Sequence, residues 1–457
     1  MKDSKIEALI RKYNVPAPRY TSYPTVPYWD TAELSLTKWQ QIVKKAFDET
    51  NEEKGISLYI HLPFCESLCT YCGCNKRITK NHKVEDPYIE AVLEEWHMYR
   101  RIFGKRAILR ELHLGGGTPT FFSPRNLKWL VSAILENVEI HPVHDFSFEG
   151  HPNNTTIEHL QVLYDQGFRR VSFGVQDLDM KVQVAINRIQ PFKNVKDVTA
   201  AARAIGYTSI NFDLIYGLPF QTLKGVGETI DKVGELMPDR IAFYSYAHVP
   251  WLRTGQRGYA DEDLPDSEEK RQLYELGKEK LTALGYVDIG MDHFSLPGDK
   301  LYKAAKDSTL HRNFMGYTVC NTDLLVGLGT SAISDAKYGY AQNAKVVEAY
   351  KEKVLEGRLP VFKGHEMTEE DLRLRSAILT LLCQNTLSID TGLSKVLDEE
   401  CKRQFEEMQE EGLVEIDGNV LKVTELGRAF IRNIAMVLDK RLQRKKPSES
   451  PVFSKAI

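Results

Sequence analysis

The sequence has almost no net charge, no long apolar run and no export signal. Lys and Arg number 60 and Asp and Glu 63, which leaves a formal net charge of −3 over 457 residues. No apolar run approaches the roughly 18 residues that a membrane-spanning helix needs. The first residues, MKDSKIEALIRKYNV, contain no apolar core of the secretory type. We therefore expect neither a membrane partner nor a generic nucleic-acid-binding role.

Cysteine is also scarce, and its placement is uneven. Four of the seven cysteines fall within ten residues and three are scattered: Cys65, Cys69, Cys72 and Cys74, then Cys320, Cys383 and Cys401. An odd count without an export signal argues against a disulfide framework and favours the reducing cytoplasm. The four clustered cysteines indicate a metal site or a redox centre, and we expect the other three to be inert packing residues.

Short apolar runs alternate with amphipathic helical stretches from residue 56 onward. Six runs are predicted to be strands: 56–62, 111–114, 146–149, 170–176, 210–216 and 240–248. Ser123 and Pro124 predict a helix start, and glycines at 167, 206 and 285 predict helix ends. This alternation predicts an α/β fold with a parallel sheet, and six units indicate a partial (β/α)6 barrel with its chemistry at the carboxyl ends of the strands.

The alternation stops near residue 360. Thr368 begins a capping pattern, and two short strands are predicted around an Asp417–Gly418 turn. The order of helices and hairpin resembles a winged helix, but an acidic helix argues against DNA binding, so we expect a lid. We therefore divide the chain into an N-terminal cover segment (1–50), a barrel (51–355) with a cysteine loop (65–74), and a mostly helical, winged-helix-like domain (360–457). Nothing in the sequence calls for more than a monomer.

The clustered cysteines have the spacing C-x3-C-x2-C. Three thiolates on a short loop, Cys65, Cys69 and Cys72, can each bind one iron of a cubane cluster and leave the fourth iron open. Zinc is the alternative, although zinc sites usually have two cysteine pairs far apart. Cys74 could complete a zinc site, so a zinc-stabilised binding protein stays open at this point.

A glycine-rich segment, GGGTPT at 115–120, follows the second predicted strand. Without Cβ atoms, its backbone can approach a small ligand closely and direct N–H groups at it. Three glycines alone more often mark an ordinary turn.

These motifs together carry a resemblance. YIHLPF at 59–64, followed by the cysteine spacing, is similar to the signature of the radical S-adenosylmethionine (SAM) enzymes. The whole chain resembles the oxygen-independent coproporphyrinogen III oxidases of haem biosynthesis. The segments that carry this resemblance are RYTSYPT (19–25), CGCNK (72–76), GGGTPT (115–120), FDLIYGLP (212–219), GMDHF (290–294) and HRNFMGY (311–317).

The resemblance implies an enzyme with one [4Fe-4S] cluster on Cys65, Cys69 and Cys72, and two molecules of SAM. A 5′-deoxyadenosyl radical from SAM would drive decarboxylation of two propionates of coproporphyrinogen III to vinyl groups, giving protoporphyrinogen IX. The implied contacts to the first SAM are Tyr59, Tyr71, Gly116, Gly117, Thr118, Glu149 and Ile333. The implied contacts to the second SAM are Gln176, Arg188, Asp213 and Ala247. An electron donor of flavodoxin or ferredoxin type is also implied.

Two features leave questions. EGHP at 149–152 departs from the pattern of Glu, an apolar residue, Asp or Asn, and Pro, so the role of His151 is open. A tetracarboxylate substrate calls for arginines, and we expect Arg19 first and Arg253 second. A related group of haem-binding chaperones shares the cysteine spacing but generally lacks the CGCNK and RYTSYPT segments, so the oxidase is favoured.

Overall fold

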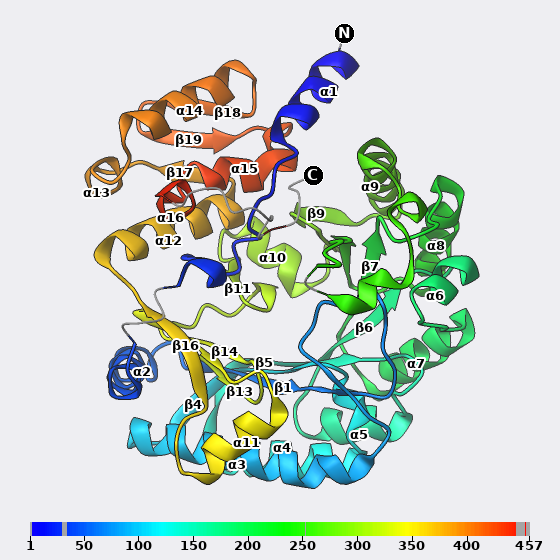
Figure 1. The fold of residues 1–457 in the computed structure, drawn as a ribbon, viewed down its shortest axis with the longest axis vertical. Helices are drawn as coiled ribbons and strands as arrows, with labels where there is room; N and C mark the ends of the chain where they lie inside the picture. The colour runs from blue at the N-terminus through cyan, green and yellow to red at the C-terminus, as the bar shows by residue number, and fades with distance from the viewer. Residues whose placement is uncertain (1, 30–33, 252, 445–452, 454–457) are drawn as a thin grey trace.

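The computed structural model describes residues 2–29, 34–251, 253–444 and 453, and it is built around one twelve-stranded sheet (Figure 1). Six neighbouring strands in its middle run parallel in chain order: β1 (Ile56–Leu62), β4 (Ala107–Gly116), β5 (Val138–Gly150), β6 (Arg170–Gln176), β7 (Ser209–Tyr216) and β8 (Arg240–Ser245). The first five strands contain their predicted runs in full. The sixth run was predicted over 240–248, but β8 ends at residue 245. The predicted partial (β/α)6 barrel is confirmed.

Helices between these strands cover the outer face of the barrel (Figure 1). They are α3 (Glu85–Phe103), α4 (Pro124–Leu135), α5 (Ile157–Asp165), α6 (Met180–Ala185), α7 (Phe192–Ile205) and α8 (Leu223–Leu236). The Ser123 side chain accepts a hydrogen bond from the Asn126 N–H at 3.3 Å and so caps α4, as predicted. Gly167 and Gly206, after α5 and α7, have φ of +95° and +114°, the left-handed conformation expected of a helix end.

Short strands extend the sheet beyond the barrel on both sides. Next to β1 lie β13 (Leu325–Leu328), β14 (Ile333–Asp335), β15 (Gly339–Asn343) and β16 (Val361–Glu366), and next to β8 lie β10 (His293–Ser295) and β9 (Val287–Gly290). Helices α9 (Ser267–Ala283), α10 (Lys300–Lys306) and α11 (Val347–Leu355) lie between these segments. The sheet therefore continues through β16, past residue 355 where the sequence placed the end of the barrel.

The C-terminal region forms a separate core of helices around a three-stranded sheet. It contains α12 (Glu369–Gln384), β17 (Thr386–Ser388), α13 (Thr391–Ser394), α14 (Glu399–Glu410), β18 (Val414–Asp417), β19 (Val420–Val423), α15 (Ile431–Met436) and α16 (Lys440–Arg444). The Thr368 cap is present, and Asp417 pairs with Val420 across the predicted hairpin turn. Residues 445–457, which end the predicted C-terminal domain, lie outside the described residues except for Phe453.

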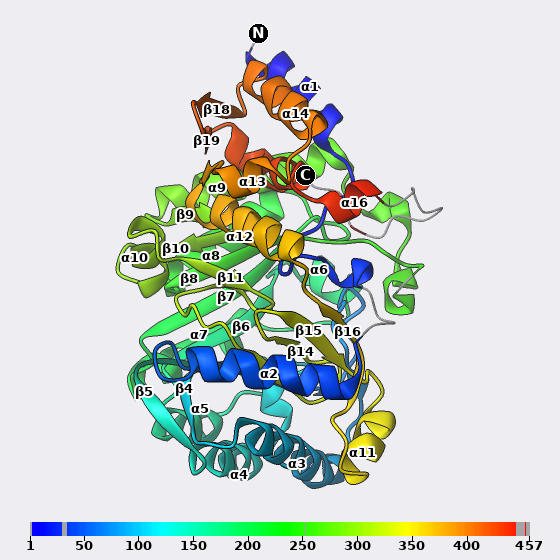
Figure 2. The ribbon, with the colours of Figure 1, turned by 90° about the vertical axis from the view of Figure 1, so that its left-hand side faces the viewer.

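The N-terminal residues divide between the two cores. Helix α1 (Lys2–Tyr13) packs on the C-terminal core, where the Tyr13 O–H donates to Glu411 at 2.5 Å. Helix α2 (Leu36–Thr50) instead buries Trp39 and Phe47 in the barrel core. Figure 2 shows α1 beside α14 at one end of the molecule and α2 alongside the barrel. Across the part of the chain described, no helix is both long and apolar enough to span a bilayer.

Candidate active site

A cavity of about 800 Å³ opens at the carboxyl ends of the barrel strands. The ends of four strands supply Gly116 from β4, Glu149 from β5, Gln176 from β6 and Tyr244 from β8, and the middle of β7 supplies Asp213. The loop that follows β1 supplies its cysteines to the same cavity. The fold thus gathers segments more than a hundred residues apart into one site, at the edge where such barrels carry their chemistry.

The cysteine loop is held at both ends by backbone hydrogen bonds. Cys65 ends β2 (Phe64–Cys65), which pairs with β3 (Arg77–Ile78), and the Thr79 N–H donates to the Cys65 carbonyl at 2.9 Å. The turn after α6 holds the middle of the loop, because Asn187 Nδ2 donates to the Leu68 carbonyl at 2.7 Å. These bonds fix the loop independently of any bound group.

The thiols of this loop face the cavity and have cations close by. Cys65, Cys69, Cys72 and Cys74 all line the cavity and are all free. Arg188 Nη1 donates to Cys69 Sγ at 3.6 Å. A hydrogen bond from Cys74, and also the charge of Lys76, lower the pKa of Cys72 below its usual value. Thiolates are the ligands that iron–sulfur clusters need, so this donor set fits an iron–sulfur cluster.

The glycine-rich segment packs directly on the end of β1. The Gly117 N–H donates to the Leu62 carbonyl at 2.8 Å, and a Cβ on Gly117 would lie 2.5 Å from the Pro63 carbonyl oxygen. Gly116 has a φ of +121° and its N–H donates to Glu149 Oε2 at 3.2 Å. Glycine is therefore needed here so that the β4 and β1 ends can meet beside the cysteine loop.

The predicted contacts on the later strands also converge. Arg188 Nη2 donates to the Gly174 carbonyl at 2.6 Å, beside Gln176. Gln176 has a φ of +66°, a conformation that is strained for a residue with a side chain and that recurs at functional sites. Asp213 accepts hydrogen bonds from Ser172 at 2.9 Å and from Asn211. Burial raises the pKa of Asp213 to about 6.

Three residues implied by the resemblance lie outside the cavity wall. The Tyr59 ring stacks on His113, 5.9 Å between ring centroids, and His113 does line the cavity. The Ala247 carbonyl accepts from Gln256 Nε2 at 3.1 Å, and the same amide donates to the Tyr71 carbonyl at 3.0 Å. These two residues stand directly behind residues of the site. Ile333 packs against a cluster that contains Trp29 and Tyr340.

His151 stands where the family pattern has Asp or Asn, and the local hydrogen bonding explains this replacement. His151 Nδ1 accepts a hydrogen bond from the Asn153 N–H at 3.1 Å. This is the bond that an Asp or Asn side chain makes to the backbone two residues on. Burial, and then the charge of Arg188, lower the pKa of His151 to about 3, so its ring is neutral and can accept this bond. Histidine therefore preserves the turn.

Sequence reasoning missed several side chains of the cavity wall: Lys76, Arg170, Arg240, Tyr244 and His293. His293 and Lys76 belong to the segments 290–294 and 72–76, which signalled resemblance but not contact with a ligand. Arg170 and Arg240 begin their strands and reach the cavity from inside the barrel. Of the two expected substrate arginines, Arg253 is exposed.

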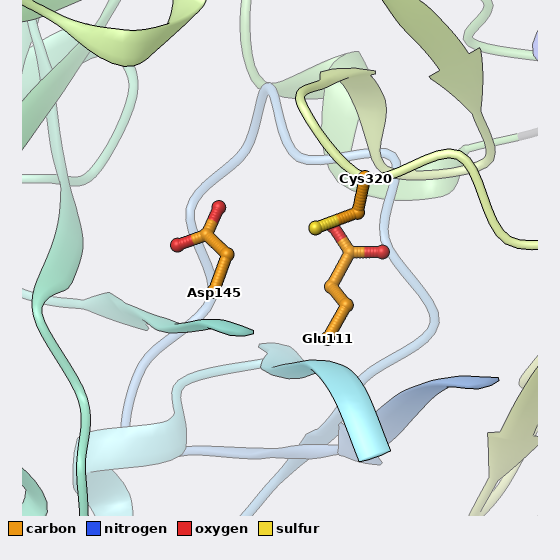
Figure 3. A group of neighbouring side chains, drawn as sticks. All are labelled: Glu111, Asp145 and Cys320. Carbon is orange, nitrogen blue, oxygen red and sulfur yellow. The ribbon is translucent and has the colours of Figure 1, made fainter. Parts of the chain in front are cut away.

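A second group of potential ligands lies deeper in the barrel, at Glu111, Asp145 and Cys320 (Figure 3). Its ligand atoms lie within 4.8 Å of one another. Both carboxylates already have partners, since Glu111 accepts from Ser57 and Thr318 and Asp145 pairs with Arg170. Burial, and then the two carboxylates, raise the pKa of the Cys320 thiol, which keeps it protonated. We therefore interpret this group as an internal hydrogen-bonded network.

Residues 59–233 match the sequence model of the Radical SAM superfamily. Together with the six-stranded partial barrel and the three cysteines at its open end, this match makes the protein a radical SAM enzyme, with a [4Fe-4S] cluster and SAM as cofactors.

Full-length relatives define the family. The chain is 38% identical over 445 residues to the oxygen-independent coproporphyrinogen III oxidase of Escherichia coli, with 96% of each chain covered. It is 37% identical to the enzyme of that name from Pseudomonas aeruginosa, with 95% of each chain covered. The solved structure of the Escherichia coli coproporphyrinogen III oxidase superposes with a TM-score of 0.87, covering 95% of this chain and 98% of that one at 35% identity. The chain belongs to the family of oxygen-independent coproporphyrinogen III oxidases.

Proposed function

We propose that this protein carries out the oxygen-independent oxidative decarboxylation of two propionates of coproporphyrinogen III, giving the two vinyl groups of protoporphyrinogen IX in haem biosynthesis. The observation that carries this function is the near-complete match, over 96% of both chains, to an oxidase of that name. The cysteine loop and the glycine-rich segment meet in one cavity, which supports the same conclusion.

When bound, the cluster and SAM supply the radical chemistry that removes a hydrogen atom from the substrate propionate. Cys65, Cys69 and Cys72 would hold the cluster. Gly116, Gly117 and Thr118 would bind the methionine part of SAM through their backbone. Glu149 would bind the ammonium group of SAM, and two observations support this role: its side chain is 44% exposed, and it accepts a hydrogen bond from the N–H of Gly116 in the glycine-rich segment.

We also propose that Gln176, Arg188 and Asp213 contact a second SAM, with Ala247 close behind them. Their convergence on the cavity beside the cysteine loop supports this assignment. Tyr71 would stack on an adenine, and its position in the cavity wall inside the cysteine loop supports this role. Tyr59 and Ile333 would support the binding site of the first SAM from behind the cavity wall. The role of Cys74 stays open, since it lines the cavity without belonging to the three-cysteine set.

The covers proposed for the cavity are the segment 19–25 and the C-terminal domain. This segment is tied to the C-terminal core, where the Tyr20 O–H donates to Asp439 at 3.1 Å, and to the sheet, where the Tyr340 O–H donates to the Tyr23 carbonyl at 3.1 Å. A cover is needed because a radical intermediate reacts with water and wrong partners unless they are excluded.

Arg19 of that segment is our proposed substrate contact, and its position next to a residue of the cavity wall supports this role. Its guanidinium carbon lies 5.7 Å from the ring centroid of Tyr244, which lines the cavity, and Nη1 pairs with Asp292 at 2.8 Å. We expect Arg19→Ala to raise the KM for coproporphyrinogen III roughly tenfold or more, since a hydrogen bond to a charged group contributes about 1.5–3 kcal/mol. The cluster absorption spectrum should not change. The exposed Arg253→Ala serves as control, and an unaltered KM in the Arg19 variant would remove Arg19 from the substrate site.

The function is tested by anaerobic incubation of the purified protein with coproporphyrinogen III, SAM and a reductant. Protoporphyrinogen IX is the expected product. Tight haem binding without turnover would instead identify a haem chaperone. Zinc in place of iron and sulfide, in anaerobically purified protein, would identify a zinc-stabilised binding protein.

For the remaining partners we propose a flavodoxin- or ferredoxin-type electron donor and a monomeric enzyme in the cytoplasm, with no nucleic acid and no membrane. The free state of all seven cysteines supports a reducing compartment.

A further inference from the structure

A small hairpin places Arg312 behind the cavity wall. The hairpin consists of β11 (His311–Asn313) and β12 (Gly316–Thr318), and Arg312 is paired with Tyr317 across it. Cross-strand partners share a face of the sheet, so both side chains point the same way. Tyr317 and Met315 of this hairpin line the cavity, and the Arg312 guanidinium carbon lies 4.7 Å from the centroid of the Tyr317 ring.

Arg312 is buried without a counter-charge. Arg312 is 5% exposed, and its Nη2 donates to the Arg19 carbonyl at 3.2 Å. Nε and Nη1 are both buried and have no hydrogen-bond partner, and no carboxylate of the described residues forms an ion pair with this arginine. An arginine stays charged at any pH at which proteins fold, so this arrangement costs free energy in the absence of an anion.

Three other arginines that are largely withdrawn from solvent have carboxylate partners. The pairs are Arg170 with Asp145, Arg240 with Asp299 and Arg375 with Asp335. Arg312 departs from this pattern although it lies beside the same cavity. Arg188 of the cavity wall also forms no carboxylate ion pair among the described residues, but its guanidinium donates to Cys69 Sγ and to the Gly174 carbonyl.

The neighbouring charged groups give Arg312 no ion-pair partner of its own. Arg19, whose carbonyl accepts from Arg312 Nη2, forms its own ion pair with Asp292. His293 packs its ring edge-to-face on Tyr317 and lines the cavity, and its Nδ1 is also buried without a partner. Burial, and then the charges of Arg312 and Arg19, lower the pKa of His293 to about 3, so it is neutral. The wall at this end carries one uncompensated positive charge.

We propose that Arg312 binds a propionate carboxylate of the tetrapyrrole substrate, with Arg19 as the neighbouring anchor. This inference rests on the proposed function, because coproporphyrinogen III carries four propionates. The planar N–H fork of a guanidinium matches a carboxylate in geometry and charge. Since Nε and Nη1 have no solvent contact, the carboxylate reaches them only when the Tyr317 ring or the segment 19–25 shifts.

The test uses Arg312→Gln and Arg312→Lys in the anaerobically purified holoenzyme. Coproporphyrin III, the stable oxidised form of the substrate, is titrated against each protein by fluorescence. We expect the dissociation constant to rise about 10-fold to 100-fold in the Gln variant and less in the Lys variant, since Lys keeps the charge but loses the fork. Iron content and SAM binding should match the wild type, which a general loss of structure would not allow.

Arg203→Gln is the matched control, because Arg203 lies on the outer helix α7 and pairs with Asp239 away from the cavity. Binding within twofold of the wild type in both Arg312 variants would overturn the proposal. If the Gln variant does not retain its cluster, the KM of the Lys variant for coproporphyrinogen III decides: a raised KM supports the proposal and an unchanged KM overturns it. A wild-type enzyme that neither binds coproporphyrin III nor converts the substrate would instead refute the proposed function.

Discussion

Replacing Cys69 with Ser is expected to abolish both the cluster and all turnover. The cysteine loop offers one thiolate for each of three irons, and losing one leaves two anchors for a cubane that needs three. Arg188, which donates to Cys69 Sγ at 3.6 Å, would keep its bond to the Gly174 carbonyl, so the rest of the site should stay folded. Iron and sulfide content and the absorption spectrum of anaerobically purified protein measure the result.

Matched cysteine variants separate ligand loss from general damage. Cys383→Ala removes a buried thiol of α12 that lies outside the cysteine loop, and this variant should keep full iron content. Cys74→Ser should also keep its iron, because the ligand set is assigned to the other three cysteines of the loop. A fully loaded cluster in the Cys69 variant would refute that assignment.

Replacing Gly117 with Ala should cause the second large loss. The new methyl group would lie 2.5 Å from the Pro63 carbonyl oxygen and 2.9 Å from that of Phe64, both backbone atoms that cannot rotate away. The ends of β1 and β4 must then separate, which costs about 1–3 kcal/mol of stability as overpacking does elsewhere. Because Gly117 stands beside the cysteine loop, we expect SAM affinity to fall at least tenfold, as measured by equilibrium binding to the reconstituted enzyme.

Gly73→Ala is the matched control for this substitution. Gly73 lies within the cysteine loop itself, but a Cβ there meets no atom within 4 Å. It should therefore leave stability and SAM affinity unchanged. If Gly117→Ala bound SAM as well as Gly73→Ala does, the close approach of the two strand ends would not be what shapes the SAM site.

The elements that follow local rules could be predicted from the sequence. The run 56–62 is β1 and the run 170–176 is β6, because continuous apolar residues between turn signals form buried parallel strands. The Thr368 cap and the hairpin around Gly418 were predictable for the same reason, since a cap or a tight turn depends on a few neighbouring residues. The cysteine spacing likewise identified the loop that lines the cavity.

Elements that depend on distant partners were not predicted. Strands such as β14, with three residues, are too short to show a period, and only the neighbouring strands define them. Lys440 begins a run of basic residues that on its own looks like a solvated helix end, yet it is only 4% exposed. It is buried because Asp398 and Cys401, some forty residues away, accept from its ammonium at 2.6 Å and 2.9 Å.

The sequence by itself therefore determined the barrel, the cysteine loop and the family, because periodicity, capping and motif spacing are local properties of the chain. Only the tertiary structure decided which charges are compensated. Arg170 and Arg312 look alike in the sequence, but one meets Asp145 in the folded barrel and the other meets no carboxylate among the described residues. The physical reason is that the energy of a buried charge depends on groups brought to it by the fold, and no spacing along the chain encodes their distance.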